Sequence, residues 1–250
     1  MTMNFLSIIP ARYASTRFPG KPLVEIQGKP MIQWVYERTS AHFPDTWVAT
    51  DDQRIFDAVE AFGGRVVMTS DSHRSGTDRI AEALETIEKT TARHYDVVIN
   101  VQGDEPLIAG DHLQTIAALF DNPSTQIGTL VKPFAADEDI FNPNTPKVVL
   151  SADSRALYFS RSVIPHIRGK EQAEWQASHT YYKHIGMYAY RAEVLREITR
   201  LPQSSLELAE SLEQLRWLEN GYTVRVGVTS VETISVDTPE DLDKLCSTLK

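Results

Sequence analysis

Three cations lie close together directly after the first hydrophobic run of the chain. Arg12, Arg17 and Lys21 share a loop stiffened by prolines, with Gly20 leaving room beside the lysine, and no carboxylate follows until Glu25. Cations on a surface loop are often simply solvated, but charge of one sign repels itself unless an anion binds. Guanidinium groups and an ammonium suit a polyphosphate, and the loop after a first strand is a common ligand site in open α/β sheets. We therefore predict a nucleoside triphosphate site.

Several familiar motifs are absent from the sequence. No GxxxxGK[ST] occurs, so the predicted site is not a Walker loop. No GxGxxG follows the first hydrophobic run, which argues against an NAD-dependent oxidoreductase. The chain also lacks HExxH, CxxC and EF-hand patterns, so zinc and structural calcium are disfavoured.

Two isolated carboxylates complete the predicted chemistry. Asp104 lies in the turn Gln102-Gly103-Asp104-Glu105-Pro106 after a β-branched run, and Asp237 precedes the start of a helix. Asp104 alone is also compatible with a simple turn residue, and Asp237 with a helix-dipole partner. A carboxylate that faces a triphosphate is repulsive unless Mg²⁺ lies between them. Because Mg²⁺ binds through few protein carboxylates plus substrate phosphates, we predict that both aspartates hold this ion.

Strands and helices alternate through the first half of the chain. Val97–Val101 is strongly β-branched and predicts a central parallel strand, and Asp111 is expected to cap a helix ending at Phe120. This rhythm predicts βαβ units and an α/β, Rossmann-like, mostly parallel sheet. Further strands are predicted at Phe5–Ile9, Thr46–Thr50 and Arg65–Thr69, and helices at Pro30–His42, from Asp52 to Gly63 and from Ser75 to Thr90.

The second half is richer in strands and loops. A helix is expected from Leu206 to Asn220, and a last one is marked by Thr238 as N-cap, Pro239 at its first position and Asp241 closing a capping box. We expect one domain, 1–250, with a β-rich excursion at 139–191. Strands are predicted at Lys147–Ser151, Ala156–Ser160, Ile185–Arg191 and Thr223–Thr229.

Composition restricts the class of protein. The 250 residues suffice for one large domain, and a net charge of −9 argues against general nucleic-acid binding. The single cysteine, Cys246, excludes an internal disulfide framework and suits a reducing compartment. No stretch reaches the roughly 18 apolar residues of a membrane span, and the N-terminus lacks a signal-peptide pattern. We expect a soluble cytoplasmic protein.

The motifs together resemble those of the CMP-Kdo synthetases, the 3-deoxy-manno-octulosonate (Kdo) cytidylyltransferases. This resemblance implies a fold of the nucleotide-diphospho-sugar transferase type, a homodimer, and Mg²⁺-dependent coupling of CTP to Kdo for lipopolysaccharide biosynthesis. Asp78 and Ser235 depart from the common family forms SGTER and GVDTP. The resemblance is carried in order by IPARYASTRFPGKPL, ATDD, SGTDR, VQGDEP, FNPN, ALYFSRSVIP, YKHIGMYAYR, LEQLRWLENG and VDTPEDL.

The resemblance also implies roles for individual residues. Arg12, Lys21, Asp104 and Asp237 would be catalytic, the two aspartates as metal ligands, and the excursion at 139–191 would build the dimer contact. CTP would be bound by Ala11, Arg12, Arg17, Lys21, Ser75, Gly76, Asp78 and Arg79. Kdo would be bound by Gln102, Arg161, His184, Tyr188, Glu213 and Gln214, with Arg161 as a carboxylate partner.

Two alternatives remain open from the sequence. A cytidylyltransferase for a related sugar acid, sialic acid or 8-amino-Kdo, would use the same chemistry with a different sugar pocket. A non-catalytic nucleotide-binding protein on the same scaffold would be expected to lack the metal carboxylates or the loop lysine, and both are present.

Overall fold

The computed structural model describes residues 3–14, 18–73, 75–232 and 234–248. The chain divides into two units, and most of the predicted excursion at 139–191 lies in the second. The first unit comprises Met1–Gln114, Ala189–Thr199 and Thr233–Lys250, and the second comprises Thr115–Tyr188 and Arg200–Glu232.

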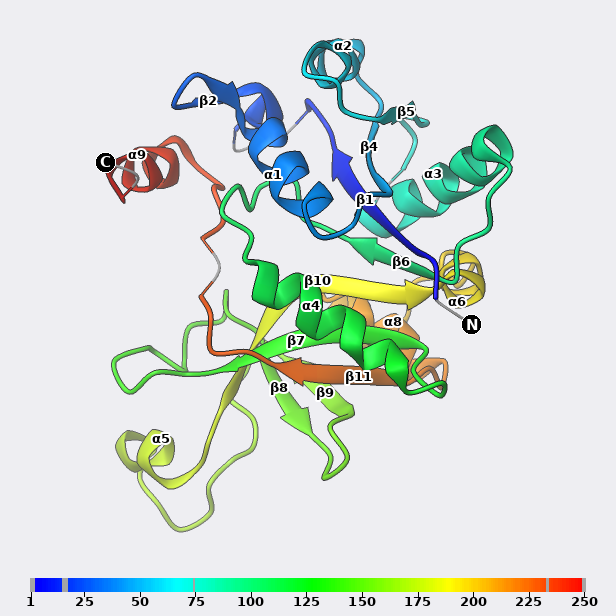
Figure 1. The fold of residues 1–250 in the computed structure, drawn as a ribbon. Coiled ribbons are helices and arrows are strands. Elements are labelled where there is room, and N and C mark those ends of the chain that lie inside the picture. Colours follow the sequence, from blue (N-terminus) through cyan, green and yellow to red (C-terminus); the bar gives the residue numbers. More distant parts are fainter. Residues whose placement is uncertain (1–2, 15–17, 74, 233, 249–250) are drawn as a thin grey trace. The chain divides into compact units, whose positions relative to one another are not determined.

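A parallel sheet forms the centre of the first unit (Figure 1). Its strands follow the order β6-β1-β4-β5, and each neighbouring pair is parallel. The pairing sets Leu6 opposite Val98, and both side chains are fully buried, as expected for strands covered on both faces. The strands are β1 (Phe5–Ala11), β4 (Thr46–Thr50), β5 (Val66–Met68) and β6 (Val97–Asn100).

Helices follow these strands and bury their apolar faces against the sheet. Asp52 caps α2 by accepting from Arg54 N at 3.0 Å, and Ser75 caps α3 by accepting from Asp78 N at 3.1 Å. Helices α1 and α3 both pack on β1 (Figure 1). The helices of this unit are α1 (Met31–Ser40), α2 (Gln53–Ala61), α3 (Gly76–Thr91), α4 (Gly110–Ala118, whose last residues belong to the second unit), α6 (Ala192–Ile198) and α9 (Pro239–Thr248), with a 3-10 turn η1 (Lys21–Leu23) and a small hairpin of β2 (Glu25–Ile26) and β3 (Lys29–Pro30).

The second unit is a mixed sheet with short helices. Strand β11 pairs in parallel with β7, which neighbours β10, and β8 pairs antiparallel with β9 and β10. Its elements are β7 (Ile127–Pro133), β8 (Lys147–Leu150), β9 (Ala156–Ser160), β10 (Tyr182–Arg191, whose last residues belong to the first unit), β11 (Val224–Val228), α5 (Trp175–Ser178), α7 (Ser205–Glu210), α8 (Gln214–Glu219), η2 (Leu119–Asp121) and η3 (Gln172–Glu174).

The predicted fold class is confirmed, and most predicted elements are present within a few residues. The single helix expected from Leu206 to Asn220 is wrong. Ser211 adopts a left-handed backbone with φ 51° and ends α7, and the chain restarts as α8. Asp111 lies in the first turn of α4 instead of capping it, and β10 begins at Tyr182 instead of Ile185.

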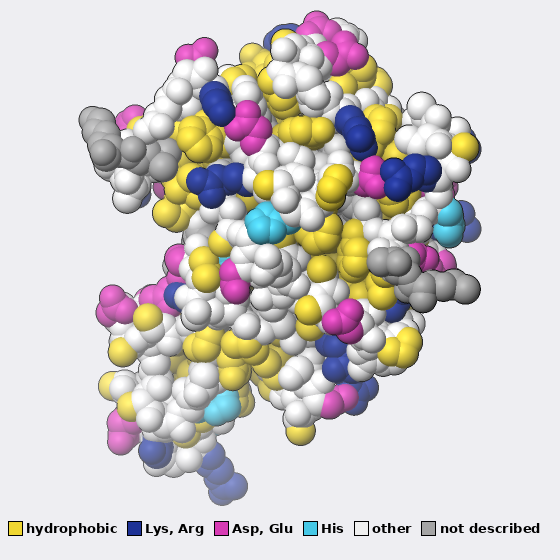
Figure 2. Space-filling view, viewed as in Figure 1, with side chains coloured by type: hydrophobic (Ala, Val, Ile, Leu, Met, Phe, Trp, Pro, Cys, Tyr) yellow, Lys and Arg dark blue, Asp and Glu magenta, His cyan; other side chains and the backbone are white. Residues whose placement is uncertain are grey.

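On the face shown in Figure 2, the described acidic and basic side chains are interspersed. Across the described residues, no helix is both long enough and apolar enough to span a bilayer.

Candidate active site

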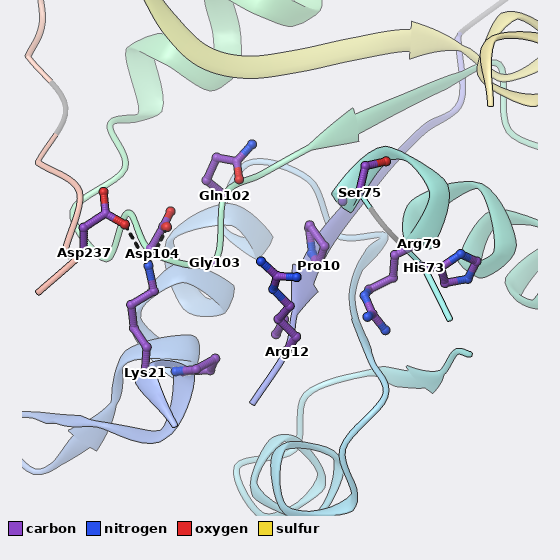
Figure 3. A pocket seen from close by; sticks show the side chains of 13 residues that line it. Pro10, Arg12, Lys21, His73, Ser75, Arg79, Gln102, Gly103, Asp104 and Asp237 are labelled. Carbon is purple, nitrogen blue, oxygen red and sulfur yellow. Dashed lines mark hydrogen bonds and ion pairs between the residues drawn. The ribbon is translucent and has the colours of Figure 1, made fainter. Parts of the chain in front are cut away.

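The loops at the carboxyl edge of the first sheet enclose a polar cavity of about 270 Å³ (Figure 3). Because parallel strands end at the same edge, the loops after β1, β5 and β6 meet there. Asp237 reaches the same cavity from the segment before α9. The lining residues are Pro10, Ala11, Arg12, Lys21, Pro22, His73, Ser75, Gly76, Arg79, Gln102, Gly103, Asp104 and Asp237.

Lys21 joins the two predicted metal carboxylates. Its ammonium lies 2.7 Å from Asp104 Oδ2 and 3.3 Å from Asp237 Oδ1 (Figure 3). The backbone supports this arrangement, since Val236 N donates to the Asp104 carbonyl oxygen at 2.9 Å. Asp241 Oδ2 accepts from the backbone N–H groups of Asp237 and Thr238 at 3.2 and 3.1 Å. Two carboxylates distant in sequence therefore converge on one point.

The neighbouring Glu105 is buried and, among the described residues, forms no ion pair. It is 6% exposed, and its burial together with the charge of Asp104 raises the pKa of the Glu105 carboxyl to about 7. The turn that holds both residues is tight, because a Cβ at Gly103 would lie 3.0 Å from the Pro10 carbonyl oxygen. Gly103 thus allows the loop after β6 to approach the loop after β1.

The basic loop after β1 is shaped by Tyr13 and Gly20. Gly20 N donates to the Tyr13 carbonyl oxygen at 3.0 Å, and Gly20 has φ 72°, a conformation that favours glycine. The guanidinium of Arg54 stacks 3.3 Å from the centre of the Tyr13 ring. Arg12 and Lys21 both line the cavity, whereas Arg17 lies outside the described residues.

The opposite end of the cavity is formed by the loop before α3 and the start of that helix. Arg79 lines the cavity but is only 4% exposed. Its guanidinium donates to Asp51 Oδ2 at 2.6 Å, to Thr69 Oγ1 at 2.6 Å and to the Ser70 carbonyl oxygen at 3.3 Å. Asp78 is not among the described residues that line the cavity, and its backbone N–H completes the cap on Ser75.

The donor set fits a magnesium ion. Among the described residues, no group of three or more His, Cys, Asp or Glu side chains is placed to hold a metal by protein ligands alone. Mg²⁺ does not require one, because it is usually bound by one or two carboxylates together with waters and substrate phosphates. Asp104 and Asp237 match that pattern, since both carboxylates already lie close to one cation, Lys21.

Arg161, predicted as the carboxylate partner of the sugar acid, is held by backbone groups of the second unit. Its Nε, Nη1 and Nη2 donate to the carbonyl oxygens of Glu210, Pro143 and Ser211 at 2.6, 3.0 and 3.3 Å. Its backbone N–H also donates to the Glu210 carboxylate at 2.8 Å. These bonds fix the guanidinium in one place and use much of its donor capacity.

The other predicted sugar-binding residues of this unit form two groups. His184 and Tyr188 contact each other with ring centres 5.2 Å apart, and Tyr188 meets Trp217 edge-on at 5.0 Å. Glu213 and Gln214 stand together at the start of α8, and Gln214 is 5% exposed. Trp217 lies on the same helix. Helix α8 therefore begins with Glu213 and Gln214 and contacts Tyr188 through Trp217.

His184 provides a test of stability against pH. Although the residue keeps some exposure, its ring lies against Phe159 and Tyr188 and contacts Thr129 Oγ1 at 3.0 Å. Burial lowers the pKa of His184 from 6.5 to about 4. The unfolded chain therefore takes up a proton at higher pH than the folded chain, so this contribution to stability is present above pH 6.5 and is lost as the pH falls toward 4.

We expect acidification from pH 7 to pH 4 to cost the wild type about 2 kcal/mol more than it costs His184→Gln, since one pKa unit corresponds to about 1.4 kcal/mol and some exposure reduces the effect. Urea denaturation of both proteins at the two pH values measures this difference. Equal pH dependence in the two proteins would contradict the buried neutral imidazole.

Comparison with known proteins identifies the family. The cytidylyltransferase family matches residues 6–234. This chain belongs to the cytidylyltransferases. It is 63% identical over 246 residues to a 3-deoxy-manno-octulosonate cytidylyltransferase of Parabacteroides distasonis, a match that covers 97% of this chain and 96% of the relative. It is 49% identical over 245 residues to the enzyme of that name from Thermodesulfovibrio yellowstonii, with 96% of each chain covered.

A solved structure supports the same assignment. A CMP:2-keto-3-deoxy-manno-octonic acid synthetase complexed with CTP matches this cytidylyltransferase with a TM-score of 0.89 and 43% identity, over 98% of each chain. The predicted family is therefore confirmed, and the protein is a nucleotidyltransferase of the α/β class.

The sequence did not indicate every residue that lines the cavity of this cytidylyltransferase. His73, Pro10 and Pro22 line the cavity and were not predicted. His73 had one detectable signal, since it lies between a predicted strand and the predicted helix start at Ser75, on a loop at the same sheet edge as the other site residues.

Proposed function

We propose that this chain transfers CMP from CTP to 3-deoxy-manno-octulosonate, giving CMP-Kdo and pyrophosphate for lipopolysaccharide biosynthesis. The observation that carries the proposal is the meeting of Lys21, Asp104 and Asp237 at one end of a cavity that Arg12 also lines. The names of the relatives and the CTP-bound state of the similar structure support the choice of substrates.

The cavity suggests how CTP would lie. Arg12 and Lys21 offer charged donors to phosphate oxygens, so the triphosphate would occupy their end. The nucleoside would then extend toward Ser75, Gly76 and Arg79, past the backbone of Ala11. Arg17, on the same loop, is proposed as a further phosphate-binding residue by its position in the motif.

The two aspartates are proposed to hold Mg²⁺ together with substrate phosphates. When bound, this ion would supply neutralisation of phosphate charge and would lower the pKa of a coordinated hydroxyl. Asp104 and Asp237 would contribute the protein ligands, and their backbone supports at Val236 and Asp241 would keep the two carboxylates convergent.

The reaction is proposed as an in-line displacement. The anomeric hydroxyl oxygen of Kdo forms a bond to the α-phosphorus of CTP, the bond from that phosphorus to the bridging oxygen of the β-phosphate breaks, and the hydroxyl proton is released. Such transfer depends on positioning and on charge stabilisation. Lys21 and Arg12 would stabilise the charge that develops on the α-phosphate and on the leaving pyrophosphate.

By their positions in the family motifs, the residues proposed to bind Kdo are Gln102, Arg161, His184, Tyr188, Glu213 and Gln214. Arg161 is preorganised by its three backbone acceptors, which favours recognition of a carboxylate by the guanidinium hydrogens that remain.

A homodimer and a cytoplasmic location are part of the same proposal. The resemblance led us to expect the dimer, and the composition led us to expect the location. Light scattering of the purified protein tests the dimer.

Pyrophosphate release from CTP and Mg²⁺, with Kdo, 8-amino-Kdo and sialic acid tested side by side, tests the proposal directly. Release with Kdo is the expected result. Release with only one of the other two acids would retain the cytidylyl transfer and overturn the sugar assignment. Binding of CTP without turnover of any acid would favour the non-catalytic alternative.

A further inference from the structure

At the nucleoside end of the cavity, two of the three side chains are engaged by their own fold. Figure 3 shows His73, Ser75 and Arg79 at the end opposite Lys21, Asp104 and Asp237. Ser75 Oγ accepts from Asp78 N in the cap of α3. Both hydrogens of Arg79 Nη1 are directed to Thr69 and Ser70, and Nη2 donates to Asp51. Ser75 and Arg79 therefore define the shape of this end of the cavity, while their side chains are already hydrogen-bonded within the fold.

His73 is placed differently. Its side chain is 18% exposed and lines the cavity, while its Nε2 is bound to Glu82 Oε2. Glu82 is fixed in turn, because its carboxylate accepts from Ser70 N at 3.0 and 3.2 Å. Burial alone would raise the pKa of Glu82, but the hydrogen bonds from Ser70 and His73 lower it. Glu82 is therefore an ionised acceptor behind the imidazole.

This arrangement sets the tautomer of the neutral His73 imidazole. An ionised carboxylate can only accept, so Nε2 of His73 carries a proton. In the neutral imidazole the remaining nitrogen, Nδ1, is then an acceptor. A fixed acceptor distinguishes the two pyrimidines, because cytosine carries an exocyclic amino group, a donor, where uracil carries a carbonyl oxygen, an acceptor.

We propose that His73 is a base-selecting residue, whose Nδ1 accepts from the exocyclic amino group of cytosine, and that Glu82 is the positioning residue that sets its tautomer. The inference rests on the proposed use of CTP and adds the means by which UTP is refused. With UTP, two acceptors would face each other and His73 Nδ1 would be left without a hydrogen bond, a penalty that polar sites use for selection.

The test compares CTP with UTP in steady-state kinetics with Kdo and in calorimetric binding with Mg²⁺ but without Kdo. In His73→Ala we expect the KM for CTP to rise about tenfold and the CTP-over-UTP preference in kcat/KM to fall about tenfold, since loss of such a bond is worth about one factor of ten. The kcat with CTP should stay within about twofold, because the phosphate end is unchanged.

Glu82→Gln separates tautomer control from simple packing. The amide can either donate or accept, so the His73 tautomer is no longer imposed, and we expect the CTP preference to fall about threefold while the KM for CTP changes less. His94→Ala is the matched control, because His94 also pairs with a glutamate, Glu88, at 2.9 Å but is 76% exposed. His94→Ala should match the wild type in the KM for CTP and in the CTP-over-UTP preference.

An unchanged CTP preference in His73→Ala would overturn the inference. If activity with both nucleotides fell equally and Tm fell as well, the role of His73 would be structural only. The binding measurement keeps this test separate from the proposed function. If the wild type transferred nothing to Kdo yet bound CTP better than UTP, the proposed function would fail, and the preference in the His73 variants would still decide the role of His73.

Discussion

Lys21→Ala is expected to lower kcat for pyrophosphate release by ~10²–10³, the loss typical of removing one preorganised donor from developing charge. Lys21 is the cation that lies within 3.3 Å of both proposed metal carboxylates. The Lys21 side chain is 15% exposed, so water replaces its ammonium poorly. Steady-state kinetics at saturating CTP, Kdo and Mg²⁺ measures the effect.

Lys21→Ala should affect the binding of Mg²⁺ much less than it affects kcat. Removing Lys21 takes away the ammonium that the Asp104 and Asp237 carboxylates share, and the repulsion between the two carboxylates favours occupation by a divalent ion. We therefore expect half-saturation by Mg²⁺ to occur at the same or a lower concentration, while kcat falls. A merely structural lysine would lower Tm and leave kcat per folded molecule unchanged.

Lys29→Ala is the matched control for this experiment. Lys29 also pairs with a carboxylate, Glu37, at 2.8 Å, but both side chains are 44% exposed, and such pairs contribute little. It should retain wild-type kcat. Near-normal turnover in Lys21→Ala itself would contradict the role proposed for the lysine and would leave charge neutralisation to Arg12 and the metal.

The convergence of the site could be predicted because it follows from topology. Residues that follow parallel strands meet at one edge of the sheet, so Lys21 after β1 and Asp104 after β6 were expected near each other. The sequence also identified the capping box of α9, because capping depends on residues only two or three positions apart. Local rules and sheet topology thus account for the position of this end of the cavity.

What the sequence could not provide are the partners chosen in three dimensions. The engagement of Arg79 by Asp51 and of Arg161 by three carbonyl oxygens depends on residues up to 50 positions away. The break between α7 and α8 has the same origin. Hydrophobic periodicity continues across Ser211, but the left-handed turn there lets Arg216 reach back to Glu207, a tertiary preference that overrides local pattern.

This Glu207–Arg216 pair carries the second large effect that we expect. Arg216 Nε donates to Glu207 Oε2 at 2.8 Å and Nη2 to Oε1 at 2.5 Å, and the two side chains are 8% and 11% exposed. Arg216→Met removes one partner and leaves a buried carboxylate uncompensated, which typically costs about 3–5 kcal/mol. Urea denaturation at pH 7 measures the free energy of unfolding. Because α8 carries Glu213 and Gln214, the KM for Kdo should rise in the molecules that remain folded.

Two further variants and the pH dependence show whether the stability loss in Arg216→Met comes from the buried charge of Glu207. Glu207→Gln in the Arg216→Met background removes the buried charge but keeps an oxygen for Ser204 N, so it should recover most of the loss. Arg196→Met breaks a single, more exposed contact from Nη2 to Glu88 Oε2 at 2.6 Å and should cost about 1 kcal/mol or less.

The hydrogen bond from Arg216 lowers the pKa of Glu207 below 4.5. Its contribution is therefore present above pH 4.5 and is lost as the pH falls, so the deficit of Arg216→Met should shrink in acid. A deficit that stayed constant from pH 7 to pH 3.5 would assign the loss to packing of the arginine stem instead of to the buried charge.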